Sequence, residues 1–241
     1  MKSTWLHRHS RQALIVFCNG WGMDDRPFRH LEADRCDVLM LWDYRQMTPV
    51  PDIAAIADSY AEIFLVGWSM GVWAGQRMFS PVREHFQAAI AVNGTLCPIH
   101  DRFGIPEATI TGTLRNFSEV SRGKLYLRMC RDRQGRLVFL ENLPARSLDG
   151  QKEELQVLMR RCDCRPAEES LYSHVMVADK DAVMPTANQL QFWQAADSRV
   201  VCGGHFPFHL WPSWDAFLAA AVRPGTEAPG ESRERPRDLS S

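Results

Sequence analysis

The sequence contains no apolar run close to the roughly 20 residues that a membrane-spanning helix requires. The longest apolar run near its start, residues 13–18, is too short for the core of a signal peptide, and no small-residue cleavage site follows it. The sequence also lacks a P-loop, a GxGxxG turn after a strand, an HExxH pattern and a calcium-binding loop. We therefore expect a cytoplasmic protein that acts without a membrane, a metal ion or a cofactor.

The sequence also has almost no net charge, because 28 Lys and Arg residues against 29 Asp and Glu residues give −1 at pH 7. This balance argues against a protein whose whole surface binds nucleic acid. Apolar residues make up 45% of the chain and charged residues 24%, a composition that excludes a wholly disordered or fibrous chain. The 241 residues are enough for one domain with a large buried core.

The seven cysteines are an odd number, and none of them forms a CxxC pair. Cys162 and Cys164 lie two residues apart, but no second Cys or His pair stands at zinc-site spacing from them. Free cysteines are most often buried. We therefore expect reduced, buried thiols and assign no role to Cys162 or Cys164.

The composition changes at residue 223. Residues 223–241 contain three Pro, two Gly and eight charged residues but no aromatic side chain. Such a segment buries too little apolar surface to order itself, so we expect a flexible polar tail after a single domain at residues 1–222. The sequence does not define the oligomeric state, and a monomer is favoured.

Short apolar runs recur along residues 1–222 at intervals that leave room for helices. Because the runs do not alternate with polar residues, they suit strands buried on both faces of a sheet. Helical periodicity appears between several of them, as in residues 53–60, and again in residues 214–221, where Ser213 is placed to cap the helix. This alternation predicts an α/β fold with a mainly parallel central sheet flanked by helices. The six predicted strands are residues 14–18, 38–42, 63–66, 88–92, 175–178 and 199–202.

The alternation stops between about residues 96 and 171, where turn and helix patterns replace strand patterns. Residues 151–162 have the pattern of an amphipathic helix. We expect this segment to be a small helical cap insertion over the C-terminal edge of the sheet, where α/β proteins keep their sites.

Residues 67–71 read Gly-Trp-Ser-Met-Gly, the GxSxG pattern of a nucleophile elbow. The pattern places its serine on a tight turn between a strand and a helix, and the flanking glycines avoid clashes with the adjoining chain. A buried strand at residues 63–66 leads into the turn, and residues 72–79 can form the helix that follows. This context favours Ser69 as a nucleophile over a serine in a structural turn.

An elbow serine needs a base and an acid later in the chain, in the order Ser, Asp, His. Asp179 and Asp181 follow the fifth predicted strand, and His205 and His209 follow the sixth. His205 comes sooner after its strand and follows two glycines that allow a sharp loop, so it is favoured over His209. The residues alone leave the choice between Asp179 and Asp181 open.

An acyl-transfer site also needs N–H groups that stabilise an oxyanion. One comes from the residue after the nucleophile, here Met70, and the other from the loop after an early strand. Residues 19–22, Asn-Gly-Trp-Gly, follow the first predicted strand, which makes the N–H of Trp21 the second candidate. A plain glycine turn is the alternative.

These residues resemble the α/β-hydrolase family and, more closely, the BioG type of pimeloyl-[acyl-carrier protein] methyl ester esterase of biotin synthesis. The likeness spans about residues 12–218, and its most specific parts are the Trp-Ser-Met-Gly-Val-Trp and His-Phe-Pro-Phe sequences. Related hydrolases often begin the oxyanion loop with His-Gly, whereas this chain has Asn19-Gly20. The matching segments are residues 19–22, 67–73, 91–95, 128–130, 181–185, 188–189, 192–193 and 205–208, together with Trp211 and Trp214.

The resemblance implies a carboxylic ester hydrolase with a catalytic triad of Ser69, His205 and Asp181, and it favours Asp181 over Asp179. The oxyanion-hole donors would be the N–H groups of Trp21 and Met70. The implied reaction removes the methyl group of the pimeloyl-[acyl-carrier protein] methyl ester as methanol, with the acyl-carrier protein as the partner that carries the substrate.

Carrier proteins are acidic, so such an esterase should present a basic surface near its pocket. Residues 115–136 hold seven Lys and Arg residues against two acidic ones, a net charge of +5 inside the predicted cap. The alternative for these residues is a solvated charged surface. For Trp21 and Trp68, which flank the candidate catalytic groups, the alternative is ordinary core packing. The residues assigned to substrate binding are Trp21, Trp68, Arg115, Arg122, Lys124, Arg128 and Arg131.

Two other functions fit part of the sequence. A broad short-chain carboxylesterase or acyl thioesterase would use the same three catalytic residues and would not need a basic surface. A binding protein that kept a hydrolase fold would not need the complete order of Ser, Asp and His, which argues against that alternative.

Overall fold

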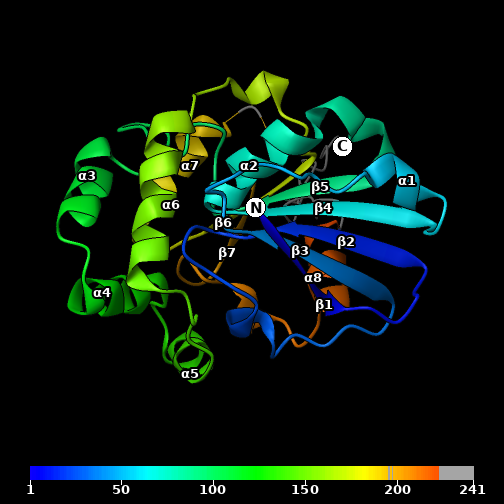
Figure 1. Cartoon of the computed structure of the whole chain (residues 1–241), viewed down its shortest axis with the longest axis horizontal. Coiled ribbons are helices and arrows are strands. Elements are labelled where there is room, and N and C mark those ends of the chain that lie inside the picture. Colours follow the sequence, from blue (N-terminus) through cyan, green and yellow to red (C-terminus); the bar gives the residue numbers. More distant parts are fainter. Residues whose placement is uncertain (195, 197, 223–241) are drawn as a thin grey trace, which may run out of the picture.

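The structure, a computed structural model, describes residues 1–194, 196 and 198–222. A seven-stranded sheet in the order β1-β3-β2-β4-β5-β6-β7 runs through the centre of this part of the chain. Figure 1 shows helices on both sides of the sheet and a further group of helices, α3 to α6, at one end of the molecule. The strands are β1 (Lys2–His7), β2 (Ala13–Cys18), β3 (Cys36–Trp42), β4 (Glu62–Trp68), β5 (Ala88–Val92), β6 (His174–Ala178) and β7 (Ser198–Val201).

From β3 to β7 one or more α-helices lie between successive strands, as the alternation predicts, and α8 follows β7. Helices α1, α2, α7 and α8 belong to the layers around the sheet, whereas α3 to α6 all fall between β5 and β6. Ser213 caps α8 as predicted, since its hydroxyl accepts the N–H of Ala216 at 3.0 Å. The helices are α1 (Ile53–Ala57), α2 (Met70–Phe79), α3 (Glu107–Arg115), α4 (Glu119–Met129), α5 (Arg133–Glu141), α6 (Leu148–Arg161), α7 (Thr186–Phe192) and α8 (Trp214–Ala221).

The sheet confirms the predicted α/β-hydrolase class. All six predicted strands form within two residues of their expected bounds, and β2 to β7 pair in parallel. The sequence did not predict β1, which pairs antiparallel with β3 at the edge of the sheet. Its exposed and half-buried residues give it no continuous apolar run, so the signal that marked the inner strands is missing from it.

Two apolar layers sandwich the sheet because successive side chains of a strand point to opposite faces. In β2, Ile15 and Phe17 belong to the cluster that contains Trp214 of α8. Leu14 and Val16 belong to the cluster on the other face, with Val72 and Phe79 of α2 and Phe192 of α7. Because both faces of the sheet are covered, every residue of β2 is buried, as expected for a central parallel strand.

The predicted cap is helical, with α3 to α6 inside the expected interval of residues 96–171. The helix expected at residues 151–162 is α6, which begins three residues earlier because Ser147 caps it by accepting the N–H of Gly150 at 3.1 Å. The tail expected at residues 223–241 lies outside the described residues. In the described part of the chain, no helix combines the length and the apolarity that crossing a membrane requires.

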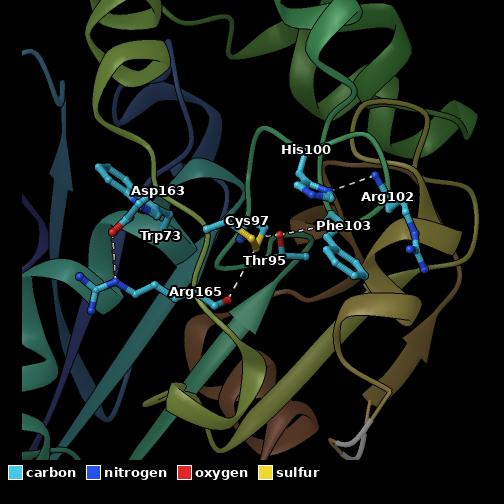
Figure 2. Close-up of a disulfide and its surroundings, with 9 residues drawn as sticks. Trp73, Thr95, Cys97, His100, Arg102, Phe103, Asp163 and Arg165 are labelled. Carbon is cyan, nitrogen blue, oxygen red and sulfur yellow. Dashed lines mark hydrogen bonds and ion pairs between the residues drawn. A yellow bond between two sulfur atoms is a disulfide. The ribbon is translucent and has the colours of Figure 1, made fainter.

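One prediction about the cysteines is wrong, because Cys97 and Cys164 form a disulfide. Cys97 follows β5 and Cys164 follows α6, so the bond joins the two segments through which the chain enters and leaves the cap (Figure 2). Here the backbone N–H of Arg165 also donates to the carbonyl of Leu96 at 3.3 Å. The remaining five cysteines are free, and Cys202 is exposed rather than buried.

Candidate active site

Ser69 occupies the turn between β4 and α2, with φ 57° and ψ −124°. A non-glycine residue in such a conformation stores about 1–3 kcal/mol of strain, which the surrounding packing must hold. Gly71 makes this packing possible, because a Cβ on it would collide with the carbonyl oxygen of Cys18 in the adjacent strand. The GxSxG segment therefore forms a strained strand–turn–helix elbow that directs Ser69 to the C-terminal edge of the sheet.

His205 lies between Ser69 and Asp181. Its Nε2 is 2.9 Å from the Oγ of Ser69, and its Nδ1 is 2.7 Å from the Oδ2 of Asp181. The three residues come from loops after β4, β6 and β7 and are buried, with exposed fractions of 5% for Ser69, 7% for Asp181 and 3% for His205. In this arrangement the imidazole can take the proton of the serine hydroxyl while the carboxylate stabilises the imidazolium that forms.

Backbone and side-chain donors fix the carboxylate of Asp181. Its Oδ1 accepts the N–H groups of Val183 at 2.8 Å and Met184 at 3.0 Å. Its Oδ2 accepts the side-chain amide of Gln189, a fully buried residue of α7, at 2.9 Å. These donors hold Oδ2 toward the imidazole of His205.

The two rival residues from the sequence have other roles. Asp179 accepts the N–H of Gly203 at 2.8 Å, so it braces the start of the loop that carries His205. The Nε2 of His209 lies 3.1 Å from Asp132, and its Nδ1 lies 3.2 Å from the carbonyl of Phe206. The structure thus brings Asp181 and His205 to Ser69, and it keeps Asp179 and His209 apart from that hydroxyl.

Trp21 and Met70, the candidate oxyanion donors, border the cavity into which Ser69 opens. Within the described part of the chain, neither backbone N–H has a hydrogen-bond acceptor. The loop of Trp21 packs closely on the elbow, since a Cβ on Gly20 would lie 3.4 Å from the Cβ of Ser69. Two free N–H groups beside a nucleophile have the composition of an oxyanion hole.

The cavity beside Ser69 is lined mostly by apolar side chains. The cap forms its roof, with Ile105, Ile110 and two threonines from the α3 region and Leu125 and Met129 from α4. Arg128 of α4 also lines it, while the rest of that side chain is exposed. The site therefore accepts an apolar chain next to the nucleophile and meets a positive charge at its edge.

Trp21 and Trp68 both line this cavity, and both are also held by hydrogen bonds. The indole of Trp68 is buried and donates to the carbonyl of His205 at 2.8 Å. The indole of Trp21 donates to the carbonyl of Gln151 in α6 at 2.7 Å. Each ring is thus a fixed wall of the pocket rather than a loose side chain at its rim.

The basic residues of the cap are not equivalent. Arg115, Lys124, Arg128 and Arg131 are exposed. Arg122 differs from the expectation, because its guanidinium pairs with Glu119 and donates to the carbonyl of Arg146 and to Gln151. Its charge serves the internal contacts of the cap and is not free for an acidic partner.

Sequence reasoning assigned no role to Asn93 and Gln189, although both amides hold the site together. Asn93 follows β5, is fully buried and donates to the carbonyl of His205 at 3.0 Å. Gln189 binds Asp181 as described above. Both residues lie in segments of the family resemblance, and that position is the one signal by which the sequence could have marked them.

Comparisons with known proteins place the chain in a family and a fold. Residues 1–217 match the family model "Pimeloyl-ACP methyl esterase BioG", where ACP is acyl-carrier protein. A crystal structure of BioG from Haemophilus influenzae superimposes with a TM-score of 0.80 at 32% identity, covering 90% of this chain and 99% of that one. An enol-lactonase from Burkholderia xenovorans shares the fold, with a TM-score of 0.61 at 16% identity over 86% of this chain and 89% of that one.

A curated sequence relative is the malonyl-[acyl-carrier protein] O-methyltransferase of Bacteroides fragilis. It is 35% identical over 185 residues, which make up 76% of this chain. The match covers 37% of the length of that relative, so this chain is similar to a part of a longer protein.

Proposed function

The chain belongs to the BioG family of pimeloyl-ACP methyl esterases, and from that premise we propose that it hydrolyses the methyl ester of pimeloyl-[acyl-carrier protein]. The products are pimeloyl-[acyl-carrier protein] and methanol. One observation carries the proposal: the hydrogen-bonded set of Ser69, His205 and Asp181 opens into an apolar cavity beneath the cap.

In the first half of the reaction, the Oγ of Ser69 attacks the carbonyl carbon of the methyl ester. The Nε2 of His205 takes the serine proton, and Asp181 stabilises the resulting imidazolium. The carbonyl oxygen becomes an oxyanion that the N–H groups of Trp21 and Met70 can bind, each such donor typically stabilising the transition state by about 3 kcal/mol. The imidazolium then gives its proton to the departing methoxide, which leaves as methanol.

In the second half, water attacks the acyl-enzyme. His205 takes a proton from the water, a second oxyanion forms in the same place, and the proton passes to the Oγ of Ser69 as the acyl–oxygen bond breaks. The free carboxylic acid is released on the carrier protein. No other reactant is needed to balance these steps.

The cavity supports an acyl chain of this kind. Its apolar lining from α3 and α4 matches a run of methylene groups, which loses contact with water on entering. The opposite end of a pimeloyl chain is a thioester that must point outward to the carrier, and Arg128 stands at the edge of the cavity.

The outer face of the cap supports an acidic partner. Arg115, Lys124, Arg128 and Arg131 are exposed there. Helices α4 and α5 also expose apolar side chains, among them Val120 at 69% and Leu137 at 47%. A basic surface with apolar contacts suits an acidic carrier protein, because long-range attraction guides the encounter and apolar burial holds the complex.

The B. fragilis relative is named for methyl transfer to malonyl-[acyl-carrier protein], a reaction that forms a methyl ester on a carrier-bound acid. An esterase that removes such a methyl group performs the complementary step. Similarity to part of that protein therefore agrees with a carrier-bound methyl ester as substrate.

The test uses the purified full chain with pimeloyl-[acyl-carrier protein] methyl ester and mass spectrometry of the carrier. We expect loss of one CH₂ from its mass, together with methanol, and no turnover by Ser69→Ala. In cells, the wild-type gene should restore growth of a biotin auxotroph that lacks its pimeloyl methyl esterase, and the Ser69→Ala gene should not.

Matched variants separate the triad from its rivals. His205→Gln and Asp181→Asn should lose nearly all turnover, whereas His209→Gln and Asp179→Asn should keep measurable turnover. Rapid hydrolysis of free p-nitrophenyl esters combined with no activity on the carrier-bound ester would replace the proposal with a broad carboxylesterase.

A further inference from the structure

Helix α6 of the cap lies directly against the loop that carries Trp21. Three hydrogen bonds join them, and all involve residues 21 and 22 of the loop and residues 151 and 154 of the helix. Gly22 has φ +75°, and a Cβ on it would lie 3.0 Å from the Nε2 of Gln151. The loop at this point has a backbone that favours glycine, and a Cβ there would press on the amide of Gln151.

Gln151 is buried, and both ends of its amide are occupied. Its Nε2 donates to the carbonyl of Gly22 at 2.7 Å and to the hydroxyl of Tyr126 at 3.0 Å. Its Oε1 accepts from Arg122 at 3.2 Å. Its backbone carbonyl accepts the indole of Trp21 at 2.7 Å. Gln151 therefore binds the loop at two consecutive residues, at the indole of Trp21 and at the carbonyl of Gly22.

Glu154 is completely buried one turn further along the same face of α6. Its Oε2 accepts the N–H of Gly22 at 3.2 Å, and its Oε1 accepts the N–H of Tyr44 at 2.9 Å. Arg146 lies 3.1 Å from Oε2. Burial raises the pKa of Glu154, while the Arg146 cation and the two N–H donors oppose that shift. Both oxygens of the Glu154 carboxylate therefore have hydrogen-bond donors.

We propose that Gln151 and Glu154 are positioning residues of the oxyanion hole. Through Gly22 they hold the preceding residue, so that the N–H of Trp21 faces the cavity at Ser69. They touch no reacting atom themselves. The inference rests on the proposed esterase function, because the oxyanion it concerns is the one formed in ester hydrolysis.

This placement makes the cap part of the catalytic machinery. Leu125, Arg128 and Met129 of α4 line the substrate cavity, and Arg122 of the same helix binds Gln151. A contiguous set of contacts therefore runs from the residues that meet the acyl chain to the loop that meets the oxyanion. A displaced cap would change the rate of chemistry as well as access to the pocket.

The kinetic effect expected of these variants depends on the stage of the reaction at which the N–H of Trp21 binds the oxyanion. An oxyanion donor acts in the transition state and not in the bound substrate, so its misplacement lowers kcat and leaves KM nearly unchanged. Complete loss of one donor typically costs about 10²–10³ in kcat, and a displaced donor should cost about tenfold or more.

The experiment compares wild type with Gln151→Ala, Gln151→Glu and Glu154→Gln on p-nitrophenyl butyrate. Active sites are first titrated to completion with a fluorophosphonate, so that kcat refers to folded enzyme. A trifluoromethyl ketone is the second probe, since addition of the Ser69 oxygen to its carbonyl carbon leaves a negative oxygen in the hole. We expect kcat to fall and the inhibition constant to rise by similar factors of about tenfold or more in each variant, with KM changed less than about twofold.

Gln151→Glu and Glu154→Gln change the hydrogen-bonding groups with little change in side-chain volume. An effect in these variants therefore cannot come from lost packing alone. In Gln151→Glu a carboxylate oxygen faces the carbonyl of Gly22, and in Glu154→Gln an amide NH₂ must oppose one of the donors that now bind oxygen. Gln156→Ala is the matched control, because Gln156 is on the same helix and makes no side-chain hydrogen bond in the described part of the chain. It should behave as wild type.

Unchanged kcat per titrated site in all three variants would overturn the inference, and so would a rise in KM alone, which would assign these residues to substrate binding. Activity on p-nitrophenyl butyrate without activity on the carrier-bound methyl ester would refute the proposed substrate and still leave this inference tested.

Discussion

The side-chain amide of Asn93 donates to the backbone carbonyl of His205 at 3.0 Å and to that of Gly204 at 3.2 Å. Asn93 is fully buried directly after β5, with φ 45°, and its Oδ1 accepts the N–H of Ala178 at 2.7 Å. One amide thus ties the end of β6 to the loop that holds the imidazole in place.

Asn93→Asp should damage both stability and turnover. The carboxylate can still accept the N–H of Ala178. Its second oxygen, however, replaces the NH₂ group that donates to the carbonyls of Gly204 and His205, and so it faces two carbonyl oxygens without a hydrogen to donate. We expect the free energy of unfolding to fall by about 2–4 kcal/mol, since two buried acceptors lose a donor beside a buried charge. The freed loop should lower kcat per active site by about tenfold. Urea unfolding and active-site-titrated kinetics measure the two effects.

Asn188→Asp is the matched control for this change. The amide of Asn188 also donates to two carbonyls, those of Asp101 and Gly104, both at 2.9 Å, but it lies away from His205. It should cost stability and spare kcat. Equal kcat losses in both variants would show that the effect of Asn93 is general destabilisation.

The disulfide should make stability sensitive to reductant. Cys97 and Cys164 are 67 residues apart, and closing a loop of that length in the unfolded chain is worth about 4 kcal/mol in the chain-entropy treatment. We expect Cys97→Ser to lower the Tm of the oxidised protein, and dithiothreitol to lower wild type to the same value. Cys202→Ser, at an exposed free thiol, should change neither.

A count of thiols checks the bond itself. Protein unfolded without reductant should titrate five thiols, and reduced protein should titrate seven. Seven thiols in both samples of freshly purified protein would contradict the disulfide. Equal Tm values with and without dithiothreitol, despite five thiols, would contradict its contribution to stability.

The hydrogen bonds of Asp37 should make the stability of the fold sensitive to acid. Its carboxylate accepts the N–H of His9 at 2.7 Å and the hydroxyl of Tyr60 at 3.0 Å, which joins the β1–β2 turn to β3 and to the end of the α1 segment. Burial favours a higher pKa for Asp37, but these donors outweigh it and hold the pKa below 3.8. Burial, with the same contact, raises the pKa of Tyr60 to about 12.

A depressed pKa in the folded state stabilises the protein above the unfolded-state value, and that stability is lost as pH falls through the folded-state pKa. Asp37→Asn should therefore lower the Tm at pH 7 and at pH 5, and the difference from wild type should shrink below about pH 4. Asp34→Asn, an exposed carboxylate three residues away, is the control and should leave the Tm unchanged. A Tm difference for Asp37→Asn that is constant from pH 7 to pH 3 would exclude this role for its charge.

The parts of the molecule that the sequence predicted are those with a local signature. Five strands were visible because burial on both faces forces continuous apolar runs. The sixth, β7, was found from its short apolar run, but it is an edge strand whose residues are exposed or half-buried, so the expectation of burial on both faces is wrong for it. Ser69 was visible because its turn needs glycines at fixed spacing. His205 was visible because it follows its strand closely, after two glycines. The choice of Asp181 over Asp179 needed the family resemblance as well.

The parts that escaped prediction depend on contacts between distant segments. Asn93 reaches a carbonyl 112 residues away, and Gln151 reaches one 129 residues away. An amide that binds backbone needs no particular residue at its partner, so neither end leaves a pattern. The pairing of Cys97 with Cys164 escaped for the same reason, because only the folded cap brings its two ends together.

The exposed basic residues of the cap give a last test, in which Arg122 must be left out because its charge is already paired. Lys124→Glu and Arg131→Glu should raise KM for the carrier-bound ester by about tenfold at low salt and weaken its salt dependence, since each reverses a charge that attracts an acidic partner. Both should leave kinetics on p-nitrophenyl butyrate unchanged, because neither residue lines the cavity. Arg161→Glu, at the exposed end of α6, is the matched reversal outside the basic segment. If it raised KM as much as the other two, the attraction would come from overall charge and not from a docking surface on the cap.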